Sequence, residues 1–316
     1  MIDFRYHLVS LIAVFLAVAL GIVIGTTALN APILADIKHQ VSALEKDKRS
    51  LENRTQQLQS QVESTDTFAE AVAPTLVDKT LAGSSVLLVV TNQDVPSDTV
   101  DQVTAMIKLA GGTVSGTLTL QPEYSDPSTA TSLQNYVTGS GRPAGIQLPS
   151  GTADAGQLVG SLLAQVLMIP PAGPAPDRAA ISSVLAGLSA LNVLTAEGDA
   201  VAPADYAVVL TAGGFTGADA ADRNATLAEL ASALDSAGSG AVVAGDVASA
   251  GDNGLVGVIR ADPTMSAALS TVDNVGTAAG RVSTVLALVS EGEGTSGKYG
   301  VGQDTQPVPP VPPATP

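Results

Sequence analysis

The sequence predicts an α/β protein in which an N-terminal transmembrane helix and a coiled coil precede a mainly parallel, Rossmann-like sheet domain. A long uncharged apolar segment lies near the N-terminus, and a heptad pattern follows it. Beyond residue 80, short apolar runs alternate with Ala-rich helical patterns, as in parallel βαβ units. The expected parts are 1–30 (tail and membrane helix), 31–72 (coiled coil), 80–300 (soluble α/β domain) and 301–316 (Pro-rich disordered tail).

The membrane helix is predicted at residues 8–29, a run of 22 residues without a charge. At about 1.5 Å per residue this run is about 33 Å long, enough to cross the core of a bilayer. It is longer than the apolar region of a signal peptide and lacks a clear cleavage site, which favours an uncleaved anchor in an inner membrane. Within it, Gly21 and Gly25 form a small-xxx-small pair that permits close helix packing.

The flanking charges do not decide on which side of the membrane the soluble domain lies. The N-terminal tail offers Arg5 and the α-amino group, whereas four basic residues follow the membrane segment within about 20 residues. This asymmetry favours a cytoplasmic domain. Long downstream domains, however, cross the membrane largely regardless of flanking charge.

A heptad repeat after the membrane segment predicts a coiled coil. Apolar residues recur every seven positions at d, and a second set lies four residues after each of them at a. The d residues are Ile37, Leu44, Leu51 and Leu58, and the a residues are Val41, Lys48, Thr55 and Val62. Leu at d with a single Lys at a favours a parallel homodimer of fixed register. The alternatives are a partner coiled coil, or an amphipathic helix packed on the domain behind it.

The α/β domain is predicted from alternating strand and helix patterns. Strands are expected at 86–90, 113–120, 191–195, 206–211, 241–244 and 270–273. Helices are expected at 98–110, 157–167, 177–190, 223–236 and 278–290. Residues 121–155 are rich in Pro, Ser, Thr and Gly and are expected to form a long insertion. Residues 169–176 form a second break, which can mark a boundary between two lobes.

Charge and side-chain inventory exclude several classes of function. The net charge of −16, concentrated beyond residue 80, disfavours binding of nucleic acid or of anionic lipid surfaces. Without cysteine there are no disulfides, thiolate nucleophiles or Cys-based metal sites. The only histidines, His7 and His39, flank the membrane segment, so the α/β domain holds neither a Ser-His-Asp triad nor a His-ligated zinc site. We therefore expect no enzyme, no catalytic residue and no identifiable cofactor.

Gly-rich loops offer weak candidates for a ligand site. Gly213, Gly214 and Gly217 follow one predicted strand, and Asp246 follows another, where parallel sheets bind ligands. The alternative is ordinary turn chemistry in a Gly-rich protein. A second Gly-rich stretch, residues 292–298, resembles dinucleotide and P-loop patterns but lacks the strand before it and the helix behind it, so it is interpreted as a flexible C-terminal turn.

The N-terminal run MIDFRYHLVSLIAVFLAVALGIVIG, followed by the heptads, closely resembles the mycobacterial copper transport protein B family of actinobacteria, and the Gly-Lys-Tyr-Gly stretch at 297–300 fits the same family. The resemblance implies a role in copper efflux and homeostasis, an outer-membrane location and an external soluble domain. Some relatives are linked instead to cell-wall remodelling with a peptidoglycan hydrolase system. A membrane-anchored scaffold that recruits envelope partners is therefore the alternative function.

The residues themselves assign no copper site. Cu(I) prefers thiolate and thioether ligands, and Met106, Met168 and Met265 are far apart in the sequence. A pore lined by the predicted membrane helix would offer Leu, Val, Ala and Gly, which give metal ions no polar path. Copper is therefore implied by the resemblance alone.

Overall fold

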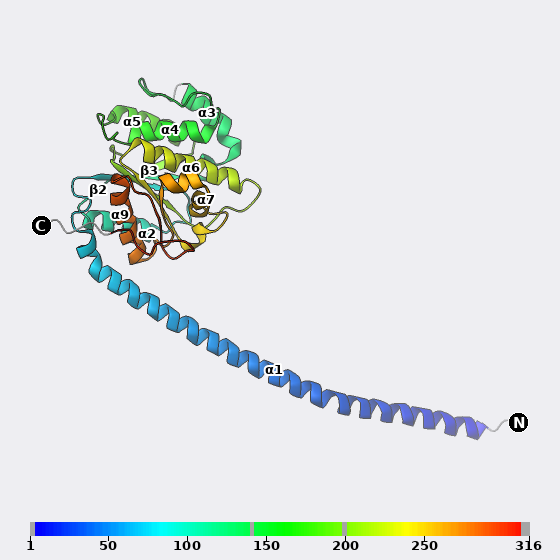
Figure 1. Cartoon of the computed structure of the whole chain (residues 1–316). Coiled ribbons are helices and arrows are strands. Elements are labelled where there is room, and N and C mark those ends of the chain that lie inside the picture. The colour runs from blue at the N-terminus through cyan, green and yellow to red at the C-terminus, as the bar shows by residue number, and fades with distance from the viewer. Residues whose placement is uncertain (1–3, 140–141, 198–200, 311–316) are drawn as a thin grey trace. The chain divides into compact units, whose positions relative to one another are not determined.

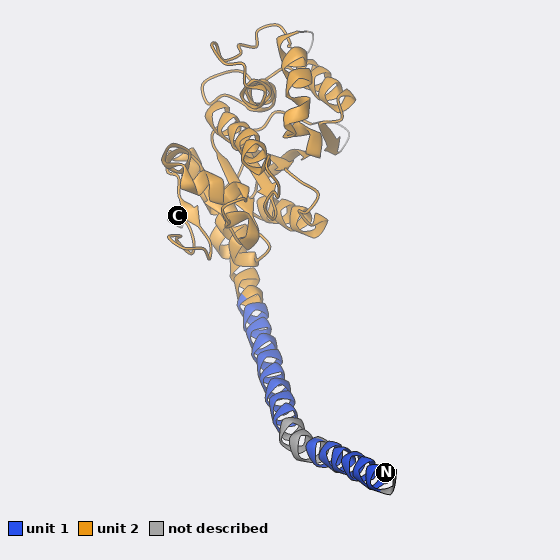
Figure 2. Ribbon diagram, turned by 90° about the vertical axis from the view of Figure 1, so that its right-hand side faces the viewer, with its two compact units in different colours: residues 1–65 blue, residues 66–316 orange. Residues whose placement is uncertain are grey.

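The computed structural model describes residues 4–139, 142–197 and 201–310, so the end of the predicted Pro-rich tail lies outside the described residues. The chain divides into two compact units, residues 1–65 and residues 66–316 (Figure 2). The first unit consists of helix, and the second contains a sheet with its covering helices.

Helix α1 (Phe4–Val77) contains both segments predicted near the N-terminus. Within it, Tyr6–Gly25 has a mean hydropathy of 2.9 and no buried residue, and is long and apolar enough to cross a membrane. The apolar heptad residues are also exposed, with exposed fractions between 48% and 67%. The predicted N-terminal apolar helix is confirmed. The coiled coil stays a prediction, because its partner helix is not part of a single chain.

The second unit is built on a seven-stranded sheet with the strand order β3-β2-β1-β4-β5-β6-β7. All neighbouring strands run parallel except the antiparallel pair of β2 and β3. The strands are β1 (Ser85–Val90), β2 (Thr113–Leu120), β3 (Leu194–Glu197), β4 (Tyr206–Thr211), β5 (Ala241–Gly245), β6 (Ser270–Val272) and β7 (Lys298–Tyr299). The mainly parallel, Rossmann-like sheet is therefore confirmed.

Helices cover both faces of this sheet (Figure 1). Val86, Leu88 and Val90 point to the face covered by the end of α1, α2 (Ser97–Leu109) and α9 (Ala278–Gly292). Leu87 and Val89 point to the other face, covered by α6 (Ala220–Ala237) and α7 (Leu255–Ala261). Since both faces are buried, the central strands are continuous apolar runs.

A further helical layer lies outside α6, as Figure 1 shows. It comprises α3 (Ala130–Thr138), α4 (Ala155–Leu167) and α5 (Arg178–Ala190), and α4 makes extensive contact with α6. Gly160 allows this close approach, because a Cβ at that position would lie 3.2 Å from the Leu230 Cα. The helix α4 is consequently buried on most sides, which explains its almost entirely apolar sequence.

The structure corrects several expectations from the sequence. The predicted insertion at 121–155 contains the 3-10 turns η1 (Pro122–Tyr124) and η2 (Pro127–Thr129) as well as α3. The 3-10 helix η3 (Val247–Ala250) and the α-helix α8 (Pro263–Ala268) were not predicted, because helices this short carry little periodicity. The predicted turn near the C-terminus lies between α9 and β7, but the strand β7, whose Tyr299 is only 2% exposed, was not predicted. Within the predicted tail, Gln306 pairs with the backbone of Lys298 and Gly300.

Candidate functional site

The sheet has a topological switch point between β1 and β4. The chain passes from β1 through α2 to β2 on one side, while β4 lies on the other side and is followed by α6 on the opposite face. The loops at the carboxyl ends of the two strands therefore diverge and leave a crevice between them. In open α/β sheets this crevice is where ligands bind.

A cavity of about 270 Å³ occupies this crevice. It is lined by residues that follow β1, β2 and β4, namely Thr91, Asn92, Gln93, Asp94, Pro122, Ser125 and Phe215. The Asn92 Nδ2 donates to the Ala212 carbonyl at 2.8 Å and so ties the β1 loop to the β4 loop. The Asn92 Oδ1 and Thr91 Oγ1 are buried without a hydrogen-bond partner among the described residues. Such unpaired atoms cost about 1–3 kcal/mol each, and a ligand that pairs with them would recover part of that energy.

The predicted loop residues lie beside this crevice and hold its rim together. Gly213, at φ +65°, donates its N–H to the Asp246 Oδ1 at 2.9 Å, and the same oxygen accepts from the Ser249 N–H at 2.8 Å. A Cβ at Gly214 would lie 3.0 Å from the Asn253 carbonyl oxygen, and Gly217 has φ +108°. The geometry of these loops is therefore sufficient to explain why Gly and Asp occupy these positions. That they also bind a ligand stays a prediction.

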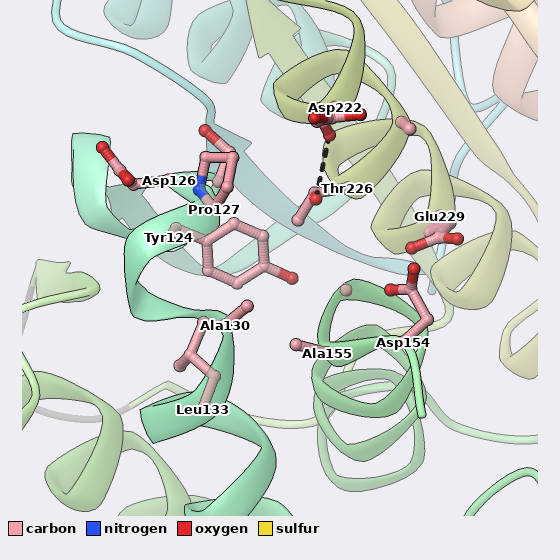
Figure 3. Close-up of a pocket in the computed structure, with 13 residues that line it drawn as sticks. Tyr124, Asp126, Pro127, Ala130, Leu133, Asp154, Ala155, Asp222, Thr226 and Glu229 are labelled. Atoms are coloured by element: carbon pink, nitrogen blue, oxygen red, sulfur yellow. Dashed lines mark hydrogen bonds between the residues drawn. The ribbon is translucent and has the colours of Figure 1, made fainter. Parts of the chain in front are cut away.

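A second cavity of about 210 Å³, the acidic pocket, lies next to the crevice, and Ser125 lines both (Figure 3). Tyr124 reaches it from η1, and Asp154 from the residue before α4. Helix α6 contributes Thr226 and Glu229, which project on one side of the helix as Figure 3 shows. The pocket thus gathers polar side chains from three separate segments.

One carboxyl group in the acidic pocket has a strongly shifted pKa. Burial, followed by the charge and the hydrogen bond of the adjacent Asp154, raises the pKa of Glu229 to about 7. Burial first, and then the Glu229 charge, also raises the pKa of Tyr124. The Tyr124 side chain is only 1% exposed, and its hydroxyl has no hydrogen-bond partner among the described residues. The Glu229 carboxyl is therefore partly protonated near neutral pH.

The positive charge nearest to the pocket is already neutralised. Arg223 donates to Asp219 at 2.6 Å and also pairs with Asp126, and its guanidinium lies 5.8 Å from the centre of the Phe215 ring. Hydrogen bonds from Ser128, with help from Arg223, lower the pKa of Asp126. Because Arg223 is occupied by these two carboxylates, it leaves Asp154 and Glu229 without a basic partner among the ion pairs of the described residues.

The donor set does not fit a copper ion held by the α/β domain. Among the described residues, no group of three or more His, Cys, Asp or Glu side chains is arranged to hold a metal ion. Met106 belongs to the core on one face of the sheet and Met168 to the core on the other, so they cannot share an ion. His7 and His39 lie on α1 in the other unit. Met265 packs against the same core as Met168, so the α/β unit, which has no cysteine or histidine, offers at most these two thioethers on one face.

A family model described as "Copper transport outer membrane protein, MctB" matches residues 1–310. The chain belongs to this family. It is 34% identical over 307 residues to "Copper transporter MctB" of Mycobacterium tuberculosis (strain ATCC 25618 / H37Rv). The alignment covers 96% of this chain and 97% of that protein. The protein of the same name from Mycobacterium leprae (strain TN) is 35% identical over 310 residues with the same coverage. The resemblance seen in the N-terminal run is thus confirmed along the chain.

Sequence reasoning missed the acidic pocket. Its residues come from a segment interpreted as an insertion and from the middle of a helix, so no local motif marks them. One signal was available for the crevice: four polar residues, 91–94, directly follow the buried strand β1. In the membrane segment, a Cβ added to Gly21 or Gly25 would meet no atom within 4 Å, so the predicted packing surface is open in the single chain.

Proposed function

We propose that this protein acts in copper efflux and copper homeostasis as a single-pass protein of the cell envelope, with its soluble domain on the external side. The observation that supports this role is the match of the family model over residues 1–310, together with relatives named as copper transporters that align over almost their full length. The helix Tyr6–Gly25 supplies a membrane anchor that is consistent with it.

The proposed role is that of one component of a transport assembly and not of a conduit by itself. The segment Tyr6–Gly25 presents Leu, Val, Ile and Ala side chains, and such a surface gives a metal ion no polar path through a bilayer. The soluble domain would then contribute by binding a ligand in the crevice or by contacting other envelope proteins.

A second role, a membrane-anchored scaffold, is favoured by the exposed heptad residues of α1. Leu44, Leu51 and Leu58 are 61–67% exposed along one stripe of this helix. A stripe of that kind pairs with a second helix in a parallel coiled coil, which would bring two membrane anchors side by side. The partner helix in this proposal is a second copy of the chain, and an envelope partner is the alternative.

Cellular copper content tests the first role. In the bacterium that makes this protein, deletion of its gene should raise intracellular copper after a copper load, and the intact gene should restore the original content. Copper and zinc are measured together by mass spectrometry, with zinc as the control metal. Unchanged copper in the deletion strain, together with altered cell separation, would instead favour the scaffold. Purified protein that conducts ions in planar bilayers would contradict the view that it is not a conduit.

A further inference from the structure

The acidic pocket contains a buried hydroxyl without a hydrogen-bond partner and two carboxyl groups without a basic partner among the described residues. In Figure 3 the Tyr124 hydroxyl points across the pocket toward the side where Asp154 and Glu229 lie. This hydroxyl is buried and unpaired, and the two carboxyl groups have no basic partner among the described ion pairs. The Asp154 Oδ1 also accepts from the Gln157 N–H at 3.2 Å at the start of α4, so its second oxygen, the Glu229 carboxyl and the Tyr124 hydroxyl are the groups that face this small space. An unpaired buried hydroxyl is costly, so a group that pairs with it would bind favourably.

The other wall of the pocket is apolar. Ala130 and Leu133 line it opposite the carboxylates, and Ala155 lies beside Asp154 at the start of α4. Gly156 keeps the floor open, because a Cβ at that position would lie 2.5 Å from the Glu229 Oε2 and 3.1 Å from the Thr226 Cα. The pocket is thus suited to a ligand with a charged end and a short apolar part.

We propose that the acidic pocket binds a primary ammonium group carried on a short apolar chain. An ammonium has three N–H donors, which match the oxygens of Asp154, Glu229 and Tyr124. The apolar chain would lie against Ala130 and Leu133. A hard divalent cation needs about six or more oxygen ligands in a closed shell, and the described residues form no cluster arranged for a metal ion.

Binding is coupled to a proton. Below neutral pH the Glu229 carboxyl is protonated, because burial and Asp154 raise its pKa to about 7. An incoming ammonium, with a pKa near 10, keeps its own proton and displaces the one on Glu229 into solvent. The other titratable or charged groups that line this pocket or pair beside it are Asp154, Asp222, Tyr124, Asp126, Asp219 and Arg223. Of these, Asp126 and Arg223 are already paired with each other.

The test is calorimetric titration of the full-length protein in non-ionic detergent with n-butylammonium at pH 6 and at pH 8. Since one proton must leave a group of pKa about 7, Kd should be about tenfold lower at pH 8 than at pH 6. The neutral analogue 1-butanol, and tetramethylammonium, which has no N–H donor, should both bind at least tenfold more weakly. Blocked lysine, tested in parallel, distinguishes a lysine side chain from a free amine as the natural source.

Two variants locate the site, and a third is the matched control. Glu229→Gln should weaken n-butylammonium binding at least tenfold and remove its pH dependence. Gly156→Ala keeps every charge but displaces the Glu229 carboxyl, and it should weaken binding as well. Glu293→Gln removes the same charge at an exposed position on the end of α9 and should leave Kd unchanged. Thermal unfolding verifies that each variant is folded.

The proposal is overturned by any of three results. These are equal binding by wild type and by folded Glu229→Gln, binding of tetramethylammonium as tight as that of n-butylammonium, or no saturable binding at pH 8. Mg²⁺ or Cu²⁺ that binds the wild type and competes with n-butylammonium would replace the ammonium site by a metal site.

Discussion

Arg260 and Asp273 form a buried ion pair that fixes the C-terminal edge of the sheet. Their side chains are 11% and 0% exposed, with 2.6 Å between Nη1 and Oδ2. Arg260 also donates to the Tyr299 carbonyl at 2.9 Å, and Asp273 accepts from the backbone N–H of Val301 and Gly302. The pair thus connects α7, β6 and β7. It also explains why glycine occupies position 300, at φ +128°, where a Cβ would meet the Asp273 carboxylate.

Replacing Asp273 by Ala should therefore destabilise the protein strongly. The change leaves the Arg260 charge buried without its partner and two backbone donors unpaired, which costs about 3–5 kcal/mol. Urea unfolding followed by circular dichroism measures the loss. Asp252→Ala, at an exposed position, is the control and should change stability by less than about 0.5 kcal/mol. Equal stability of the two variants would contradict the view that the Arg260–Asp273 ion pair stabilises the fold.

A second single residue, Glu291, makes the stability of the folded protein depend on pH. Burial is the main cause that raises its pKa to about 7, although Ser270 donates its N–H to the carboxylate at 2.6 Å and opposes the shift. Between its unfolded pKa near 4.5 and about 7, the folded state binds more protons than the unfolded state. Stability should accordingly fall as pH rises through this window.

Glu291→Gln should remove that share of the pH dependence. We expect the difference in unfolding free energy between pH 5 and pH 7.5 to shrink by about 1–2 kcal/mol, a figure reduced for solvent screening. Urea unfolding at both pH values measures it, with Glu293→Gln as the exposed control. A difference that is the same in the variant and the wild type would show that Glu291 does not titrate in this range.

At the scale of elements, the strength of the local pattern decided what the sequence could predict. Strand β4 and helices α4 and α6 follow their predicted positions closely, because each is an apolar or Ala-rich run of suitable length bounded by Asp, Gly or Pro residues. Helix α3 and strand β7 were missed. Their burial depends on neighbours far along the chain, such as the contact of α3 with α4 and of β7 with β6, and not on a local repeat.

The predicted coiled coil is tested on α1. Leu44→Asp combined with Leu51→Asp places two charges in the apolar stripe and should abolish self-association, because a coiled-coil seam tolerates few charges. Sedimentation of the full-length protein in detergent measures the mass of the oligomer. Gln56→Asp combined with Gln59→Asp, outside the a and d positions of the same helix, is the control. A dimer that survives the leucine replacements would show that this stripe is not the interface.

At the scale of the whole molecule, the predicted membrane segment and the candidate ligand sites lie in different compact units of the chain. The apolar segment lies in residues 1–65, whereas the crevice and the acidic pocket lie in residues 66–316. The crevice and the acidic pocket can therefore act on whichever side of the membrane the α/β unit occupies.

Topology is the prediction at this scale. Alkaline phosphatase fused after Pro316 should be active in intact cells, because we propose that the α/β unit lies outside the cytoplasm. Green fluorescent protein at the same junction is the complementary control and should not fluoresce after export through the general secretory pathway. Fluorescence without phosphatase activity would place the unit inside and agree with the basic residues that follow the membrane segment.

The sequence by itself determined the apolar N-terminal helix, the order of most strands and helices, and the absence of cysteine and histidine from the α/β unit. These properties depend on composition and local periodicity. Only the tertiary structure decided the strand order, the crevice at its switch point, and the meeting of Tyr124, Asp154 and Glu229 in one pocket. The physical reason is that α4 packs across α6, a contact between distant segments that no local pattern encodes.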